Sequence, residues 1–106
     1  MDIHKLSGFT KGWFVGDFVP TIVPTKDFEV SIKRYMKGDK EAKHVHKVAW
    51  EITAVVSGKY IMAGKEIGAD DIVYLAPDEP ADFECLEEGV TVVVKAPSAK
   101  GDKYLV

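Results

Sequence analysis

The chain has 106 residues, which is enough for one domain with one hydrophobic core. Its formal net charge of −3 and its scattered lysines argue against the dense basic face that nucleic-acid binding requires. No apolar segment is long enough to cross a bilayer, so we expect neither a nucleic-acid nor a membrane partner. The single cysteine, Cys85, excludes an internal disulfide and fits a reducing compartment. Because the N-terminus lacks the apolar segment of a signal peptide, we expect a cytoplasmic protein.

In chain order, residues 1–26 come first and are rich in glycine, proline and aromatic residues. We interpret them as an N-terminal arm with one or two short strands that pack Trp13 and Phe14 on the main body, residues 27–106. Residues 28–35 then alternate with a period of two, which is typical of a strand. Further short strands are expected at 51–56, 59–62, 72–75, 82–85 and 91–95.

Ser57 and Gly58 are interpreted as a turn between two of these strands. Residues 96–106 are expected to return as a strand or to cover the body. No apolar stripe at helical spacing extends over three turns. Short strands separated by Gly, Pro and Asp therefore predict an all-β, antiparallel sandwich or barrel.

Two histidines separated by one residue lie in the segment from Gly38 to Gly58. On a strand, His44 and His46 point to the same face, about 6.6 Å apart along the chain. A turn over residues 47–49 followed by a second strand brings Glu51 back beside the pair. Two imidazoles and one carboxylate on one face are a ligand set for a divalent transition metal, namely iron, manganese, nickel, zinc or copper.

The spacing of this segment is Gly38, five residues, His44-x-His46, four residues, Glu51, six residues and Gly58. In this it resembles the first sequence motif of the cupin superfamily. The resemblance implies a single-domain, conical β-barrel of the double-stranded β-helix or jelly-roll type, often dimeric, with the motif lining the interior. It also implies that His44, His46 and Glu51 are metal ligands, and we expect a homodimer.

The second cupin motif, which supplies a fourth ligand, is incomplete in residues 70–85. Ala81 stands where the histidine is expected, Asp78 replaces the usual turn glycine, and Cys85 stands where an asparagine is common. Cys85 shares strand parity with Ala81, but four residues of strand separate the two by about 13 Å. We therefore interpret Cys85 as a small buried apolar residue and not as a replacement ligand.

Three functional hypotheses follow. The first is a metal-dependent enzyme acting on a small molecule, dioxygenase- or isomerase-like, with Tyr35, Thr53 and Lys95 as pocket residues. The second is a metal-free cupin that binds or isomerises a sugar or other small molecule and uses His44 and His46 as proton-transfer groups. The third is a binding module without turnover. The catalytic candidates are His44, His46 and Tyr35.

Overall fold

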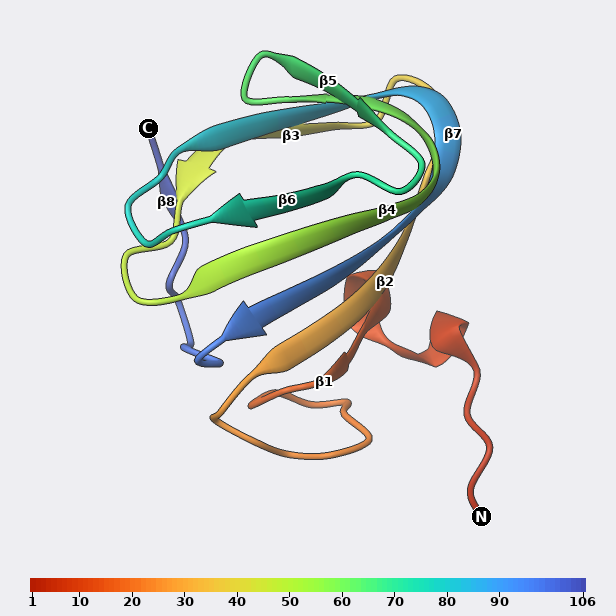
Figure 1. Cartoon of the computed structure of the whole chain (residues 1–106). Coiled ribbons are helices and arrows are strands. Elements are labelled where there is room, and N and C mark those ends of the chain that lie inside the picture. Colours follow the sequence, from red (N-terminus) through yellow and green to blue (C-terminus); the bar gives the residue numbers. More distant parts are fainter.

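Strands make up most of the chain, and there is no α-helix (Figure 1). The computed structural model describes all 106 residues. Its elements are two short 3-10 turns, η1 (Leu6–Gly8) and η2 (Thr10–Gly12), and eight strands: β1 (Trp13–Val15), β2 (Glu29–Tyr35), β3 (Lys40–Val45), β4 (Trp50–Met62), β5 (Lys65–Gly68), β6 (Ile72–Leu75), β7 (Ala81–Ala96) and β8 (Tyr104–Leu105). The all-β prediction is confirmed.

The two long strands, β4 and β7, join two walls of a barrel. The first part of β7 pairs with β3 and with the end of β4, whereas its second part pairs with β2 and with the start of β4. One wall therefore runs β1-β2-β7-β4-β6 and the other runs β8-β3-β7-β4-β5, with every pairing between these strands antiparallel. The two walls face each other (Figure 1). Their strands carry the core residues and most of the residues that line the candidate site.

The prediction of a turn at Ser57 and Gly58 is wrong, because β4 continues through both residues. The register of β4 against β7 shifts on either side of Ser57, so the strand bends there. Gly58 has a φ of 92°, and a Cβ on Gly89 would lie 2.1 Å from the Ser57 carbonyl oxygen. These glycines permit a close approach of two backbones at a barrel corner, which is why a turn-like pair stands inside a strand. The strands expected at 82–85 and 91–95 are likewise one strand, β7.

The hydrophobic core lies along the pairing of β4 with β7. Its buried members come from β4 and β7 and are Val55, Tyr60, Met62, Ala81, Phe83 and Cys85. The rings of Tyr60 and Phe83 stack with centroids 5.0 Å apart. Cys85 is 1% exposed, in accord with its interpretation as a small apolar residue, and burial raises the pKa of its thiol.

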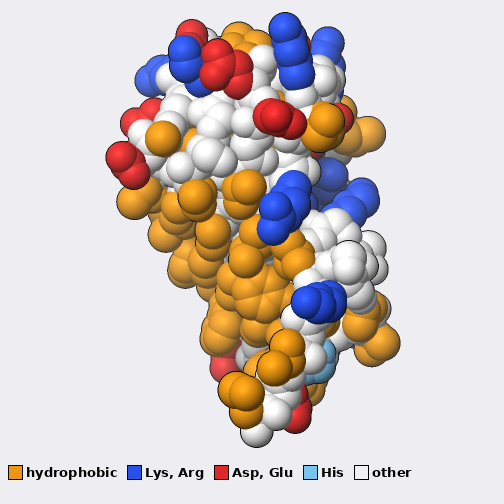
Figure 2. All heavy atoms as spheres, turned by 90° about the vertical axis from the view of Figure 1, so that its right-hand side faces the viewer, with side chains coloured by type: hydrophobic (Ala, Val, Ile, Leu, Met, Phe, Trp, Pro, Cys, Tyr) orange, Lys and Arg blue, Asp and Glu red, His pale blue; other side chains and the backbone are white.

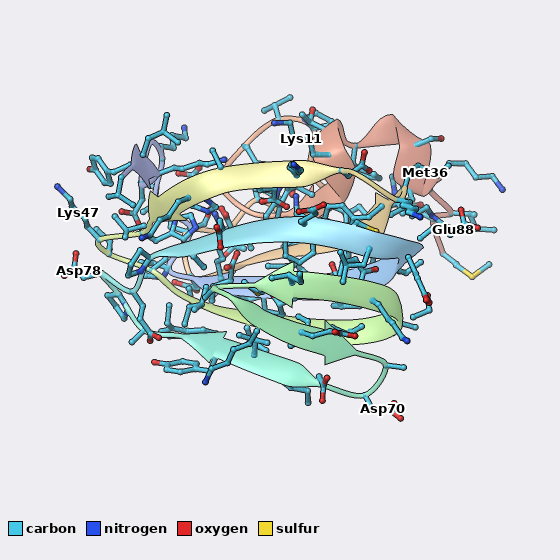
Figure 3. The ribbon with its side chains drawn as sticks, turned by 90° about the horizontal axis from the view of Figure 1, so that it is seen from above. Lys11, Met36, Lys47, Asp70, Asp78 and Glu88 are labelled. Atoms are coloured by element: carbon cyan, nitrogen blue, oxygen red, sulfur yellow. The ribbon has the colours of Figure 1, made fainter.

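The two ends of the chain complete the edges of the walls. Strand β1 pairs with the edge of β2, and the tail returns as β8 beside β3. Seen from above, Lys11 lies on the side covered by the N-terminal turns, whereas Lys47 and Asp78 lie at the opposite end of the barrel from Met36 and Glu88 (Figure 3). Neither helical segment has the length or apolar character needed to span a bilayer.

Candidate functional site

The polar part of the interior contains two adjoining cavities. The larger has a volume of about 800 Å³ and opens beside η1, η2 and β1, and the smaller has a volume of about 30 Å³. The same six side chains line both, and they come from β2, β3, the loop after β3 and the start of β4: Lys33, Tyr35, Glu41, His44, His46 and Glu51. The three residues predicted as metal ligands therefore share one space.

His44 and His46 stand next to each other at the end of β3. His44 lies within the strand and is half-buried, and His46 follows the strand and is buried. Their ring centroids are 5.1 Å apart with an interplanar angle of 82°. The Nδ1 of His44 lies 2.8 Å from the carbonyl oxygen of Ala42, and the Nδ1 of His46 lies 2.5 Å from that of Asp102.

These hydrogen bonds determine the tautomer of both rings. A carbonyl oxygen only accepts, so each Nδ1 carries the proton and donates it. In the neutral form of each ring, the lone pair is then on Nε2. Both imidazoles are thus available as acceptors or metal ligands through Nε2.

The C-terminal tail holds the loop that carries His46. The Asp102 carboxylate accepts hydrogen bonds from the backbone N–H groups of Lys47, Val48 and Ala49 at 2.8, 3.1 and 2.9 Å. Burial raises the pKa of Asp102, but the three N–H donors outweigh it and hold the pKa below its ordinary value. Asp102 therefore joins the tail to the loop between β3 and β4 and also fixes the His46 ring through its carbonyl oxygen.

Glu51 enters the cavity from the second position of β4. Its neighbours across the strands are Lys95 on β7 and Leu75 on β6, and its half-buried carboxylate has no hydrogen bond or ion pair. Glu51 lines the same cavities as His44 and His46, but no three His, Cys, Asp or Glu side chains converge closely enough to hold a metal ion. The structure gathers the predicted ligands around one cavity without preforming a ligand cluster.

Ala81 is buried directly opposite His44, its partner in the pairing of β3 with β7. Side chains opposite each other in an antiparallel pair point to the same face. The position at which the sequence lacks the expected histidine therefore faces the same space as His44. It also lines the smaller cavity.

Tyr35 and Glu41 form a hydrogen-bonded pair in the cavity wall. The Tyr35 hydroxyl donates to Glu41 Oε2 at 2.5 Å. Burial and the neighbouring Glu41 carboxylate raise the pKa of Tyr35 far above its ordinary value. The hydroxyl therefore remains a donor at neutral pH and cannot act there as a base. Thr53 and Lys95, the other predicted pocket residues, line the smaller and the larger cavity respectively.

No protein-family model matches the chain, and no curated protein matches its sequence. Solved structures do match its fold. An uncharacterized conserved protein with a double-stranded β-helix domain from Klebsiella pneumoniae subsp. pneumoniae MGH 78578 is 25% identical, with a TM-score of 0.68 over 80% of this chain and 79% of that one. An RmlC-like cupin from Shewanella frigidimarina NCIMB 400 is 21% identical, with a TM-score of 0.65 over 73% and 71%.

The chain has the double-stranded β-helix fold of these small cupins. KdgF from Halomonas sp. has the same fold at 17% identity, with a TM-score of 0.66 over 72% of this chain and 74% of KdgF. Likeness at these identities shows the fold, and the resemblance inferred from the histidine segment is confirmed at that level.

Three residues of the candidate site, Lys33, Glu41 and Asp102, were missed from the sequence. Lys33 lies on the inward face of β2 with Ser31 and Tyr35, so the period of two along residues 28–35 already contained the signal. The sequence around Asp102 did not indicate its role, because its contacts are with loop residues more than fifty positions earlier in the chain.

Proposed function

We propose that this cupin binds a divalent transition metal through His44, His46 and Glu51 and acts on a small molecule in the cavity beside it. The observation that carries the proposal is the hydrogen bonding of the two histidines. Each ring donates a hydrogen bond from Nδ1–H to a backbone carbonyl. The lone pair of Nε2 is then free to bind a metal ion. Metal-ligating histidines typically have their other ring nitrogen fixed in this way.

The donor chemistry of the cavity also fits a metal. The Glu51 carboxylate has no partner within the chain, and the smaller cavity is lined by both histidines and by Glu51. Binding requires these side chains to close around the ion, since they are not gathered in advance. Ala81 contributes no ligand beside His44, so three protein ligands would leave coordination positions open for water or a small molecule.

A divalent ion held by His44, His46 and Glu51 would supply Lewis-acid chemistry to a small-molecule substrate. The chain itself supplies the surroundings. Tyr35 is held as a neutral donor by Glu41, the carbonyl oxygen of Asp102 fixes the His46 ring, and Lys33 contributes a cationic group. Dioxygenation and isomerisation are the two reaction classes that we consider, because an open position on a metal ion could take up dioxygen or polarise a substrate carbonyl.

The test is metal content by mass spectrometry on untagged protein purified without chelator. Wild type is compared with His46→Ala and with His4→Ala. His4 is a matched control, because it lies in the N-terminal segment beside Phe9 and lines neither cavity. We expect near-stoichiometric metal in wild type and His4→Ala and its loss in His46→Ala. No metal in any variant, even after reconstitution, would overturn the proposal.

A second candidate function is metal-free proton transfer on a small molecule, with His44 and His46 as the exchanging groups. The observation that favours it is the separation of the three candidate ligands. Both rings present Nε2 as an acceptor, which is what a general base requires. The two functions differ in the response to a chelator: metal-free turnover would survive metal removal and still be lost in His46→Ala. Ligand binding without turnover would instead indicate a non-catalytic module.

We propose further that the cupin forms a homodimer through the outer face of its β2-β7-β4-β6 wall. Two cross-strand rows on this face are entirely apolar: Val30, Val94, Ile52 and Tyr74 in one, and Ile32, Val92, Ala54 and Ile72 in the other. Ile72 is 71% and Tyr74 56% exposed. A side view shows a continuous band of hydrophobic side chains, with charged side chains gathered mainly above it (Figure 2). In a homodimer, the same apolar face of a second copy of the chain packs against this one.

A further inference from the structure

Lys33 is a cationic side chain in the cavity with no acidic partner. It lies on the inward face of β2, opposite the buried Thr91, and is half-buried. Its Nζ is 4.8 Å from the ring centroid of Trp13, and it makes no ion pair and no hydrogen bond. The neighbouring ring face is the only specific contact of this ammonium group.

Lys95 lies near the same Trp13 ring as Lys33 but has an acidic partner. Its Nζ is 4.9 Å from the same Trp13 centroid, but it also forms an ion pair with Glu29 at 2.7 Å. The ammonium groups of Lys33 and Lys95 therefore both lie over the Trp13 indole ring, but only Lys95 also has a carboxylate partner. Lys95 is satisfied within the chain, whereas Lys33 is not.

The carboxylates near Lys33 do not neutralise it. Glu41 accepts the Tyr35 hydroxyl, and neither Glu41 nor Glu51 lies within ion-pair distance of Lys33. Burial lowers the pKa of Lys33, against the opposing effect of Glu41 and Glu51. A partly desolvated charge without a partner is unfavourable, so its presence in a cavity is typical of a group that binds a ligand.

The wall of the larger cavity is cationic although the chain as a whole is acidic. The formal net charge of the chain is −3. The cavity wall nevertheless has only three acidic residues, whereas its unpaired lysines are Lys11, Lys33, Lys40 and Lys103. Lys95 is paired with Glu29, and Arg34 is exposed. A concave surface with an excess of one charge concentrates ligands of the opposite charge. The charge of this cavity therefore favours an anionic ligand.

We propose that the larger cavity binds a small carboxylate, whose carboxylate group pairs with Lys33 beside the Trp13 ring while the rest of the molecule extends toward His44 and His46. This inference names the ligand class of the function proposed above and rests on the same cavity. A carboxylate suits the site better than a phosphate for two reasons. The only arginine, Arg34, is exposed, so the interior lacks a guanidinium fork, and the chain has no α-helix whose N-terminus could bind phosphate.

The test is a titration of ¹⁵N-labelled, metal-stripped full-length protein with succinate, followed through the Trp13 indole N–H and the amides of β2. Succinamide is the neutral control ligand, and inorganic phosphate is the competing anion. The variants are Lys33→Met, which keeps the length of the side chain, Lys33→Arg, which restores the charge, and Lys40→Met, which removes one charge from the exposed part of the same cavity wall.

We expect saturable binding of succinate by wild type and none of succinamide. A charge-assisted contact of the usual strength predicts that Lys33→Met weakens succinate binding about tenfold or more, with recovery in Lys33→Arg and about twofold change in Lys40→Met. Equal affinity in wild type and Lys33→Met, equal binding of succinamide, or no binding by wild type would overturn the proposal. Tighter binding of phosphate than of succinate would overturn the assignment of a carboxylate.

The succinate test and the metal test can each fail independently of the other. Metal content is measured in Lys33→Met and succinate affinity in metal-stripped His46→Ala. We expect Lys33→Met to retain its metal and His46→Ala to retain succinate binding. Absence of succinate binding by wild-type protein that takes up metal normally contradicts only the carboxylate inference. Normal succinate binding by wild-type protein that takes up no metal contradicts only the metal proposal.

Discussion

Asp102→Ala removes the group that joins the C-terminal tail to the loop between β3 and β4. In the wild type, this carboxylate accepts from three consecutive backbone N–H groups, those of Lys47, Val48 and Ala49. Alanine accepts none of these hydrogen bonds. We therefore expect the substitution to loosen the loop that carries His46 and to lower the stability of the whole domain.

The three N–H groups contribute unequally to the cost. Lys47 and Val48 are exposed, so water can replace the carboxylate, whereas Ala49 is buried and its N–H is left without a partner. A hydrogen bond to a charged group contributes about 1.5–3 kcal/mol, and an unsatisfied buried donor costs about 1–3 kcal/mol. We expect a loss of about 3 kcal/mol, which for a domain of this size lowers the Tm by roughly 10–20 °C. Asp102→Asn retains one acceptor oxygen, and we expect about half of that loss.

The assay is thermal unfolding followed by circular dichroism, with urea unfolding as a second measure. Asp27→Ala is the matched control, because Asp27 is exposed and its carboxylate makes no hydrogen bond or ion pair. Asp27→Ala is expected to unfold within about 2 °C of wild type, as substitutions away from such contacts usually do. A Tm for Asp102→Ala that equals that of Asp27→Ala would refute this account of the loop.

Three further predictions concern the site, the core and the outer face. Ala81→His places a third imidazole opposite His44, and we expect Zn(II) affinity measured by calorimetry to rise at least about tenfold; unchanged affinity in a folded variant would count against the placement of the site. Tyr60 is fully buried and its pKa is raised to about 12, so the stability contributed by its neutral hydroxyl is complete below pH 10 and is lost as the pH rises toward 12. The unfolding free energy of Tyr60→Phe should therefore fall less steeply than that of wild type between pH 10 and 12, and equal slopes in urea unfolding would contradict the assignment. Ile72→Glu introduces a charge into the exposed apolar face, and we expect light scattering after gel filtration to show a monomer where wild type is a dimer; a wild-type monomer would argue against that interface.

The strand pattern was predictable wherever one face of a strand is buried. In β2 the inward residues, such as Ser31 and Lys33, alternate with the outward Val30 and Ile32, and this period is visible in the sequence. The continuity of β4 was not predictable in the same way. Ser57 and Gly58 have the composition of a turn, but Gly58 serves a close approach to β7, which is a tertiary contact.

The candidate site was also predictable only in part. The spacing of His44, His46 and Glu51 was sufficient to place them around one cavity, because a short loop returns the chain directly from β3 to β4. The contacts that fix His46 could not be read from that spacing. They come from Asp102, at the far end of the chain, and only the return of the tail beside β3 brings them together.

We propose that His44 and His46 hold a metal through Nε2, and the imidazole nitrogens can be observed directly. Long-range ¹H–¹⁵N spectra of the three histidines, recorded as Zn(II) is added to metal-stripped protein, distinguish the two nitrogens of each ring. We expect Nδ1 of His44 and His46 to stay protonated and the Nε2 resonance of both to shift when one equivalent of Zn(II) binds. The His4 resonances should not respond. Unchanged spectra of His44 and His46, or metal binding through Nδ1, would contradict this proposal.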